Sequence, residues 1–180
     1  MNISLRKPTS YDLLELENLF KITIGNAFRQ EGIVGGDEVH SEVKNQLDLV
    51  NQEFSGSSSA VFFLIAENEK RIVGTGAFCP ANSIIQKYMT FDFEKASEIA
   101  SMYVLPDHQG QGIGTILLKG ILSALKSRNI SKYCLDCGYR NSQQFWSRRL
   151  GEPPVILPAY WGSGSDHMIW YGSVDDVRAE

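Results

Sequence analysis

The most informative part of the chain reads Met102-Tyr-Val-Leu-Pro-Asp-His-Gln-Gly-Gln-Gly-Ile-Gly-Thr-Ile-Leu-Leu118. It begins like a strand, Pro106 stops that strand, and three glycines precede an apolar run at helical spacing. Glycines let a backbone turn tightly and come close to a ligand. The free N–H groups in the first turn of a helix, at its positive dipole end, attract anions. The stretch therefore predicts a strand, a loop and a helix that together bind a phosphorylated cofactor.

The segments around this stretch carry further strand and helix patterns. Alternation and β-branched or aromatic content predict strands over residues 3–6, 61–67, 71–78, 98–105, 130–137 and 166–171. Apolar residues at helical spacing predict helices over residues 13–28, 39–54, 113–128 and 141–150. Residues 79–96 fit no single element. The order β-α-α-β-β-β-α-β-α-β predicts one α/β domain over residues 1–180, with a central mixed β-sheet flanked by helices.

Charge and hydropathy exclude several classes of partner. The 180 residues include 17 Lys and Arg against 21 Asp and Glu, a net charge of −4. That balance supplies no basic face of the kind that binds nucleic acids. The longest apolar run, residues 60–66, is too short to span a bilayer, and the N-terminus lacks the apolar core of a signal peptide. We expect a cytoplasmic protein with no nucleic-acid or membrane partner.

The three cysteines predict neither a disulfide framework nor a metal site. Their number is odd, unlike that of a secreted disulfide scaffold. Cys134 and Cys137 form a C-x-x-C, but zinc would need a second pair of ligands. A redox motif would open a helix, whereas the residues around Cys134 resemble a strand. We expect structural thiols and no metal. His40 and His167 are also expected to be structural, and Trp161 and Trp170 to lie in the core.

The glycine spacing narrows the choice of cofactor without settling it. A phosphate loop of the Walker type needs Lys after its last glycine, and Thr115 follows Gly114 instead. A dinucleotide-binding loop needs G-x-G-x-x-G with an acidic residue about 20 residues further on. Here the glycines run G-x-G-x-G, although Asp136 lies at about the right distance. The two helices and the hairpin that precede the loop argue against a dinucleotide fold.

Gln109-Gly-Gln-Gly-Ile-Gly114 resembles the Gln/Arg-x-x-Gly-x-Gly/Ala signature of the GNAT family of N-acetyltransferases, and the order of elements is similar to that fold across nearly the whole chain. The resemblance implies acetyl-CoA as co-substrate, admitted where the middle strands of the sheet splay apart. Its pyrophosphate would lie near Thr115 and on the loop amides of Gln109, Gly110, Gln111, Gly112, Ile113 and Gly114. The backbone of Met102, Tyr103 and Val104 would hold the pantetheine arm like an added strand. The alternative is a plain strand–turn–helix whose glycines serve packing.

Glu98 is the candidate general base that would take the proton of the attacking amine. It lies eleven residues before Gln109, a spacing similar to that of the glutamate base in the histone-modifying branch of the family. Strict alternation would place Glu98 on one face with Met102 and Val104, and a bulge would break that relation. The alternative is a solvated carboxylate at the end of a strand.

The chain departs from the family at the expected proton donor. Many members have Tyr at the end of an Asn-x-x-Ala/Ser-x-x-Phe-Tyr pattern, and here Trp146 stands at the Tyr position and Tyr139 at the Asn position. An indole N–H can donate a hydrogen bond but cannot act as a general acid. Tyr139 and Tyr160 are candidate replacements, unless the thiolate leaves without a protein acid. Asn141 could reach the pantetheine.

The resemblance predicts an acetyl-CoA-dependent N-acetyltransferase that passes the acetyl group directly to a primary amine of a small molecule or peptide, in a ternary complex. The alternative is a catalytically silent acyl-CoA-binding or regulatory domain, which Trp146 favours. Dimers are common in the family, so a homodimer is compatible with the sequence. The acceptor stays open, because a fold does not determine its substrate.

Overall fold

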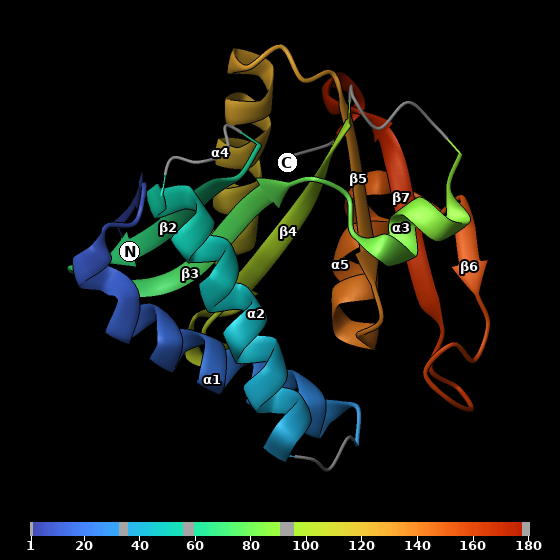
Figure 1. The fold of residues 1–180 in the computed structure, drawn as a ribbon, viewed down its shortest axis with the longest axis horizontal. Helices are drawn as coiled ribbons and strands as arrows, with labels where there is room; N and C mark the ends of the chain where they lie inside the picture. The colour runs from blue at the N-terminus through green and yellow to red at the C-terminus, as the bar shows by residue number, and fades with distance from the viewer. Residues whose placement is uncertain (1, 33–35, 56–59, 91–95, 178–180) are drawn as a thin grey trace. The chain divides into compact units, whose positions relative to one another are not determined.

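A computed structural model describes residues 2–32, 36–55, 60–90 and 96–177. Its strands are β1 (Ile3–Arg6), β2 (Phe62–Asn68), β3 (Arg71–Cys79), β4 (Ala96–Val104), β5 (Lys132–Cys137), β6 (Val155–Leu157) and β7 (His167–Ser173). Its α-helices are α1 (Leu13–Gln30), α2 (Gly36–Ser55), α3 (Ser83–Tyr88), α4 (Ile113–Ser127) and α5 (Arg140–Leu150). The strands form one sheet in the order β1-β2-β3-β4-β5-β7-β6, drawn in Figure 1. The predicted α/β class with a mixed sheet is confirmed.

Every predicted strand and helix exists, with ends that differ by at most three residues from those expected. The predicted order was wrong in lacking α3 and β6. Asn82 explains α3, because its side chain accepts hydrogen bonds from the backbone N–H groups of Ile84 and Ile85. This cap starts a helix of only six residues, too short for a periodic pattern to reveal. Strand β6 has three residues and pairs with β7 alone, at the edge of the sheet.

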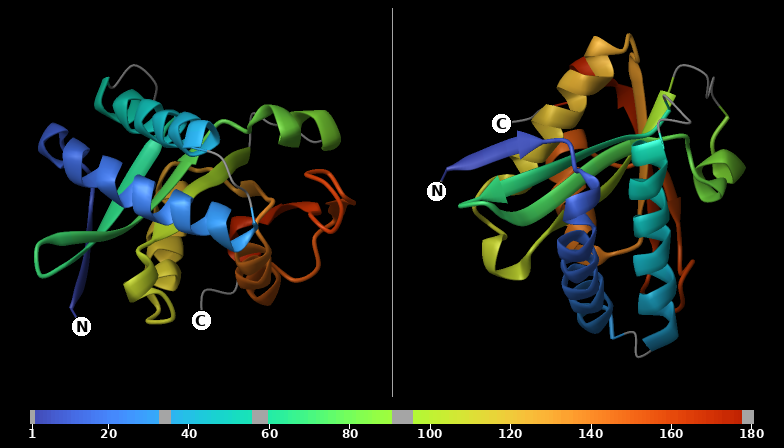
Figure 2. Two further views of the ribbon diagram at one scale, coloured as in Figure 1. Left: turned by 90° about the horizontal axis from the view of Figure 1, so that it is seen from below. Right: turned by 60° about the vertical axis from the view of Figure 1, so that its left-hand side comes forward.

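The chain forms two compact units, and β4 contributes to both. The first unit consists of Met1–Phe78 and Ala100–Ile121, and the second of Cys79–Ile99 and Leu122–Glu180. In the first, β1, β2 and β3 pair antiparallel, and α1 and α2 lie on one face of these strands while α4 lies on the other (Figure 2). The core between α1, α2 and the strands includes Leu16, Phe20, Val43, Phe63 and Ile65.

Helix α4 lies close against the strands of the first unit. A Cβ at Gly120 would come within 2.7 Å of Leu5 Cδ1 and 2.9 Å of Leu64 Cδ1. One at Gly76 would lie 2.8 Å from Met102 Sδ. The same Cβ would lie 3.4 Å from Ile121 Cγ1 of α4, so small residues on both surfaces permit the close approach of α4 to the strands.

In the second unit, β5 pairs parallel with the beginning of β4 and antiparallel with β7. Figure 1 shows α3 on one side of β5 and β7 and α5 on the other. Ile85 of α3 packs with Cys134 and Ile169 in a core of its own. On α5, Gln143 is buried, and its amide donates to the carbonyls of Cys137 (3.1 Å) and Asp166 (2.9 Å).

The cysteines fit the expectation of structural thiols. Cys79, Cys134 and Cys137 are free and buried, and the C-x-x-C pair lies in strand β5 as predicted. Burial raises the pKa of the Cys134 thiol to about 12, so the thiol is neutral at physiological pH. In the described ranges, no group of three or more His, Cys, Asp or Glu side chains is arranged to hold a metal ion. No helix within those ranges has the length and apolar character needed to cross a bilayer.

Candidate active site

The glycine-rich loop joins a short 3-10 helix at Pro106–His108 to α4 and keeps a shape that only some residues allow. Gly110 and Gly112 have φ values of 72° and 84°, a left-handed conformation in which a Cβ is strained. The Gly112 carbonyl accepts the Ile116 amide at 3.0 Å, so α4 begins directly after it. The N–H groups of the first turn have no acceptor within the helix. The loop thus combines a tight turn with the positive end of a helix dipole.

Two glutamine side chains brace this loop from within. Gln109 Nε2 donates to the Val104 carbonyl at 3.0 Å, and Gln111 Nε2 donates to the Asp107 carbonyl at 3.0 Å. Gln109 therefore ties the loop to the end of β4. The Val104 carbonyl, one of the groups predicted to hold the pantetheine, already accepts this hydrogen bond.

The space beside Gly110 and Gly112 of the loop is open. A Cβ built at Gly110 or at Gly112 would meet no atom within 4 Å. In contrast, a Cβ at Gly74, on the neighbouring strand, would lie 3.0 Å from the Tyr103 carbonyl. Gly110 and Gly112 therefore serve backbone conformation and access rather than packing. This observation argues against the alternative that they are packing residues of a plain strand–turn–helix.

Strand β4 changes its backbone conformation at Ser101. This residue lies between Glu98, the predicted base, and Met102, the first residue predicted to hold the pantetheine. Ser101 has a φ of 53°, which is rare for a residue other than glycine and breaks the alternation of faces, as a bulge does. Its carbonyl accepts the Thr75 hydroxyl at 2.7 Å, and its own hydroxyl donates to Gln46. Glu98 therefore does not keep the simple facing relation with Met102 and Val104 that strict alternation would give.

The Glu98 carboxyl is buried, with a residue exposure of 7%. It accepts hydrogen bonds from the Asn82 backbone N–H at 2.7 Å and from Asn82 Nδ2 at 3.1 Å. Burial and the negative charge of Asp136 raise the pKa of Glu98 to about 8, although the Asn82 hydrogen bonds oppose this shift. The alternative of a solvated carboxylate is excluded, because Glu98 is buried in the second unit.

Asn82 also contacts a second acid. Its Oδ1 caps α3, so the amide orientation is set and Nδ2 turns away from the helix. Nδ2 lies 3.1 Å from Glu98 Oε1 and 3.0 Å from Asp136 Oδ2. Asp136 Oδ2 in turn lies 3.1 Å from His167 Nε2. The short helix α3 thus brings a carboxamide between two carboxyl groups.

The aromatic side chains around His167 complete this group. Trp161 Nε1 donates to His167 Nδ1 at 3.0 Å, and the Tyr160 ring centroid lies 5.4 Å from that of His167. Trp170 is buried as predicted. The prediction for Trp161 was wrong, since the residue is 58% exposed, although its indole N–H has a buried partner in His167. We call Asn82, Glu98, Asp136, Trp161 and His167 the carboxylate cluster.

The other predicted catalytic residues lie at the start of α5. Tyr139 is the N-cap residue of α5, half-buried, and its carbonyl accepts the Gln143 amide at 2.8 Å. Asn141 is exposed on the first turn. Trp146 is buried and packs edge-on against Phe145. Tyr160, the other tyrosine considered as a proton donor, is in ring contact with Trp161 and His167 of the carboxylate cluster.

Of the carboxylate cluster, sequence reasoning named Glu98 alone as catalytic. Asn82 carried a readable signal, since Asn followed by Ser favours a helix cap. Asp136, Trp161 and His167 carried none, because their proximity depends on how β5, β7 and the preceding loop pair. The structure therefore divides the predicted residues between a loop in the first unit and a buried polar cluster in the second.

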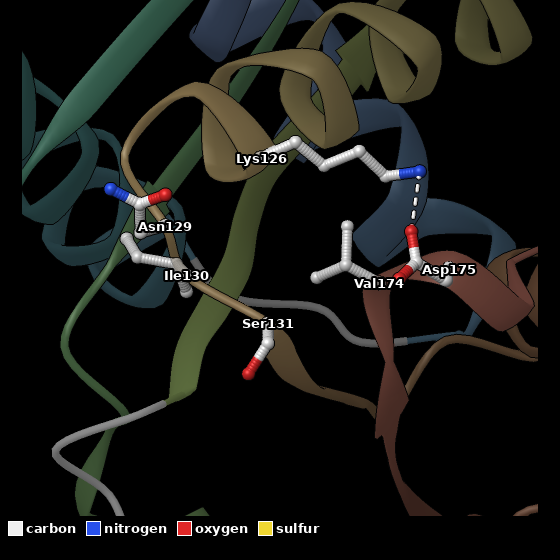
Figure 3. A pocket seen from close by; sticks show the side chains of 6 residues that line it. All are labelled: Lys126, Asn129, Ile130, Ser131, Val174 and Asp175. Atoms are coloured by element: carbon white, nitrogen blue, oxygen red, sulfur yellow. Dashed lines mark ion pairs between the residues drawn. The ribbon is translucent and has the colours of Figure 1, made fainter.

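The second unit also has a pocket of about 270 Å³ at the ends of α4 and β7, lined by Lys126, Asn129, Ile130, Ser131, Val174 and Asp175. Figure 3 shows Lys126 reaching across it to Asp175, and Nζ lies 2.7 Å from Oδ1. None of the predicted site residues lines this pocket. We do not assign it to the candidate active site.

Comparison with known proteins places this arrangement in a family. The model of the acetyltransferase (GNAT) family matches residues 27–151, more than half of the chain. No curated protein matches the sequence.

Solved structures of three acetyltransferases resemble the chain over most of its length. PaiA N-acetyltransferase from Thermoplasma acidophilum, in complex with coenzyme A, has 16% sequence identity and a TM-score of 0.69, over 96% of this chain and 99% of that chain. YncA from Salmonella typhimurium, assigned as an acetyltransferase and solved with acetyl-CoA, has 17% identity and a TM-score of 0.67, over 97% and 95%. A spermidine N-acetyltransferase SpeG chimera from Vibrio cholerae and hSSAT has 17% identity and a TM-score of 0.66, over 97% of each. At these identities the likeness concerns the fold, and with the matching family model it leads to one conclusion: the chain belongs to the GNAT family of acetyltransferases.

Proposed function

We propose that the chain is an N-acetyltransferase that passes an acetyl group from acetyl-CoA directly to a primary amine in a ternary complex. The buried Glu98 carboxyl carries the proposal, because its pKa of about 8 suits a group that accepts a proton near physiological pH. Glu98 lies on β4, the strand that leads into the glycine-rich loop. The strand thus connects a candidate base to a candidate cofactor site.

The loop is suited to the phosphates of acetyl-CoA. The positive φ values of Gly110 and Gly112 and the open space beside them let a ligand approach the loop backbone. The amides from Gln109 to Gly114, with Thr115, would hold the pyrophosphate. Met102 and Tyr103 would offer backbone groups to the pantetheine, as would the N–H of Val104, whose carbonyl is bonded to Gln109. The cofactor complexes of PaiA and YncA support this choice of ligand.

Glu98 would remove the proton that the attacking amine must lose. When bound, acetyl-CoA supplies the thioester whose acyl carbon the amine attacks. In the transfer, the new C–N bond forms, the C–S bond breaks, and the amine proton goes to the ionised Glu98 carboxylate. Because the pKa of Glu98 is about 8, the ionised fraction and the rate should rise with pH up to that value. The thiolate would take its proton from Tyr139, from Tyr160 or from water, and Asn141 would contact the pantetheine.

The acceptor belongs to the class of primary amines. Glu98 and Asp136 place two carboxyl groups at the site and no basic side chain other than His167 in the carboxylate cluster, which favours a cationic ligand. A spermidine N-acetyltransferase among the similar structures supports including polyamines among the candidates. Peptide N-termini and small monoamines belong in the same screen.

Thermal unfolding with acetyl-CoA, followed by a screen of amines for release of CoA thiol, tests the proposal. A ligand at about 100 times its Kd stabilises a protein by about 2.7 kcal/mol, which raises the Tm of a chain of this size by about 5–10 °C. We expect this rise with acetyl-CoA and not with NAD or ATP. Stabilisation without thiol release from any amine would instead identify a silent acyl-CoA-binding domain. No stabilisation would refute the cofactor assignment.

A further inference from the structure

The carboxylate cluster forms a continuous chain of polar contacts from a buried carboxyl group to the surface. The contacts run from Glu98 to Asn82, from Asn82 to Asp136, from Asp136 to His167, and from His167 to Trp161. Glu98 and His167 have residue exposures of 7% and 4%, whereas Trp161 is 58% exposed. The members come from β4, from the start of α3, from β5, from β7 and from the loop before β7. Through such a chain of contacts, the orientation of the group at one end can depend on the group at the other end.

Two members of the carboxylate cluster, Glu98 and Asp136, share one hydrogen-bond donor. Glu98 and Asp136 accept hydrogen bonds from the same Asn82 nitrogen, at 3.1 and 3.0 Å, so the two carboxyl groups are close neighbours. Two carboxylates that share a buried site do not both ionise readily. Burial therefore raises the pKa of Glu98, and the negative charge of Asp136 adds to this effect.

His167 places a ring nitrogen beside the Asp136 carboxyl group. Trp161 Nε1 can only donate a hydrogen bond, so the His167 Nδ1 that receives it must present a lone pair. In the neutral ring the proton is then on Nε2, which lies 3.1 Å from Asp136 Oδ2. The alignment of this contact falls short of a regular hydrogen bond, but it places an N–H beside the carboxylate. Asp136 thus has two N–H neighbours, one from Asn82 and one from His167.

Building on the proposed acetyl transfer, we infer that His167 is a positioning residue: through Asp136 and Asn82, it orients the Glu98 carboxyl and holds the Asp136 carboxylate beside it. Trp161 acts one step further out by selecting the tautomer of His167. No member of this chain other than Glu98 is required to touch the substrate. The inference concerns residues for which sequence reasoning expected only structural roles.

Among the residues that the structure describes, two further titratable groups face Glu98, and both are neutral thiols. Glu98 faces Cys79 from β3 and Cys134 from β5 in addition to Asp136. Burial raises the pKa of both thiols, that of Cys134 to about 12, so both are neutral at neutral pH. His167 faces Asp136, Trp161 and the Tyr160 ring. Asp136 is therefore the negative neighbour through which His167 acts on Glu98.

The first test reads the tautomer of His167 in the free protein, without any turnover. In ¹⁵N NMR spectra at neutral pH, we expect the wild-type ring to show one tautomer, protonated on Nε2. Trp161→Phe keeps an aromatic ring at an exposed position but removes the N–H donor, and we expect it to give a mixture of the two tautomers. A single Nε2–H tautomer in both proteins would overturn the role of Trp161. A wild-type ring protonated on Nδ1 would overturn the whole inference.

The second test follows the ionisation of Glu98 by ¹³C NMR of its side-chain carboxyl. His167→Leu removes the ring nitrogen beside Asp136, so the Asp136 carboxylate is no longer held against Asn82 and Glu98 and its effect on the pKa of Glu98 weakens. We expect the midpoint of Glu98 ionisation to move by roughly one pH unit toward acid. His167→Gln offers an amide N–H in place of Nε2–H, and we expect it to restore the wild-type midpoint. If His167→Leu fails to fold, Trp161→Phe provides the same comparison with a smaller shift.

The pH profile of kcat/KM links these measurements to catalysis. Its acid limb should move with the Glu98 midpoint in His167→Leu and return in His167→Gln. If the wild type acetylates an amine but the midpoint and the limb stay in place in His167→Leu, the inference fails and the proposed function stands. If the wild type releases no CoA with any amine, the proposed function fails, and the positioning role fails with it.

Discussion

The replacement Glu98→Gln should change how the stability of the protein depends on pH. Glu98 has an ordinary pKa of 4.5 and a folded-state pKa of about 8, because burial and Asp136 disfavour its charged form. A group whose pKa is raised by folding contributes stability that is complete below its unfolded pKa and is lost as pH rises through the folded value. The Glu98 contribution should therefore be present at about pH 4.5 and absent above about pH 8.

The size of this change in stability follows from the difference between the unfolded and folded pKa values of Glu98. Each pH unit between the two pKa values lowers the free energy of unfolding by about 1.4 kcal/mol. From about pH 4.5 to pH 7, wild type should lose about 3 kcal/mol that Glu98→Gln does not lose. The corresponding difference in Tm is about 6–12 °C for a chain of this size. Gln cannot accept both Asn82 hydrogen bonds, so the variant starts from a lower stability, but that offset does not depend on pH.

Urea titrations of both proteins at several pH values between about 4.5 and 8 measure the effect. The quantity to compare is the difference in the free energy of unfolding between wild type and variant at each pH, since other carboxyl groups titrate equally in both. Replacing the exposed Glu152 by Gln in the same way provides the control. Wild-type and Glu98→Gln curves that run parallel over this range would show that Glu98 ionises normally, and the argument for a buried base would fall.

Two further predictions concern the cofactor loop and the ion pair between the partly exposed Arg6 and the buried Asp12. Gly112→Asp should abolish stabilisation by acetyl-CoA in a thermal-shift assay. Gly112→Asn introduces a side chain of the same size that also tolerates a positive φ, so this variant should retain part of the stabilisation. Equal loss in both variants would mean that charge at the loop is irrelevant. Arg6 binds both oxygens of Asp12, at 2.7 and 2.8 Å, and lowers the pKa of Asp12, so this pair stabilises the fold above the ordinary pKa of 3.8 and loses its effect as pH falls below it. Because Arg6 is partly exposed, Asp12→Asn should cost only about 1 kcal/mol at pH 7 and less at about pH 3; a cost that grows in acid, measured by urea unfolding, would contradict the assignment.

Local sequence signals were sufficient for the loop and the main elements. The strand–loop–helix unit could be predicted, because its signals lie within the unit itself: Pro106, the glycines and the apolar spacing of α4. The conformation of Ser101 could not, because its hydroxyl and carbonyl partners, Gln46 and Thr75, lie far away along the chain.

The carboxylate cluster shows why the rest of the site escaped prediction. Asp136 pairs with Ile169 in the register of β5 and β7, and no residue near Asp136 in the sequence predicts this pairing. Asn82 lies in the segment that fitted no pattern, and its role depends on capping a six-residue helix. Trp161 was expected in the core, yet it is 58% exposed, and its contacts with the buried His167 arise from the fold rather than from neighbouring residues.

The initial rate of CoA release from acetyl-CoA and a reactive amine, recorded against pH for wild type and Glu98→Gln, tests the central claim most directly. For wild type, kcat/KM should rise with pH and level off with an apparent pKa near 8, the value expected for the Glu98 carboxyl. In Glu98→Gln, the rate at neutral pH should fall by about 10²–10⁴-fold, with partial recovery in alkali and little change in acetyl-CoA affinity. An unchanged rate and profile in Glu98→Gln would show that this carboxyl takes no part in the transfer.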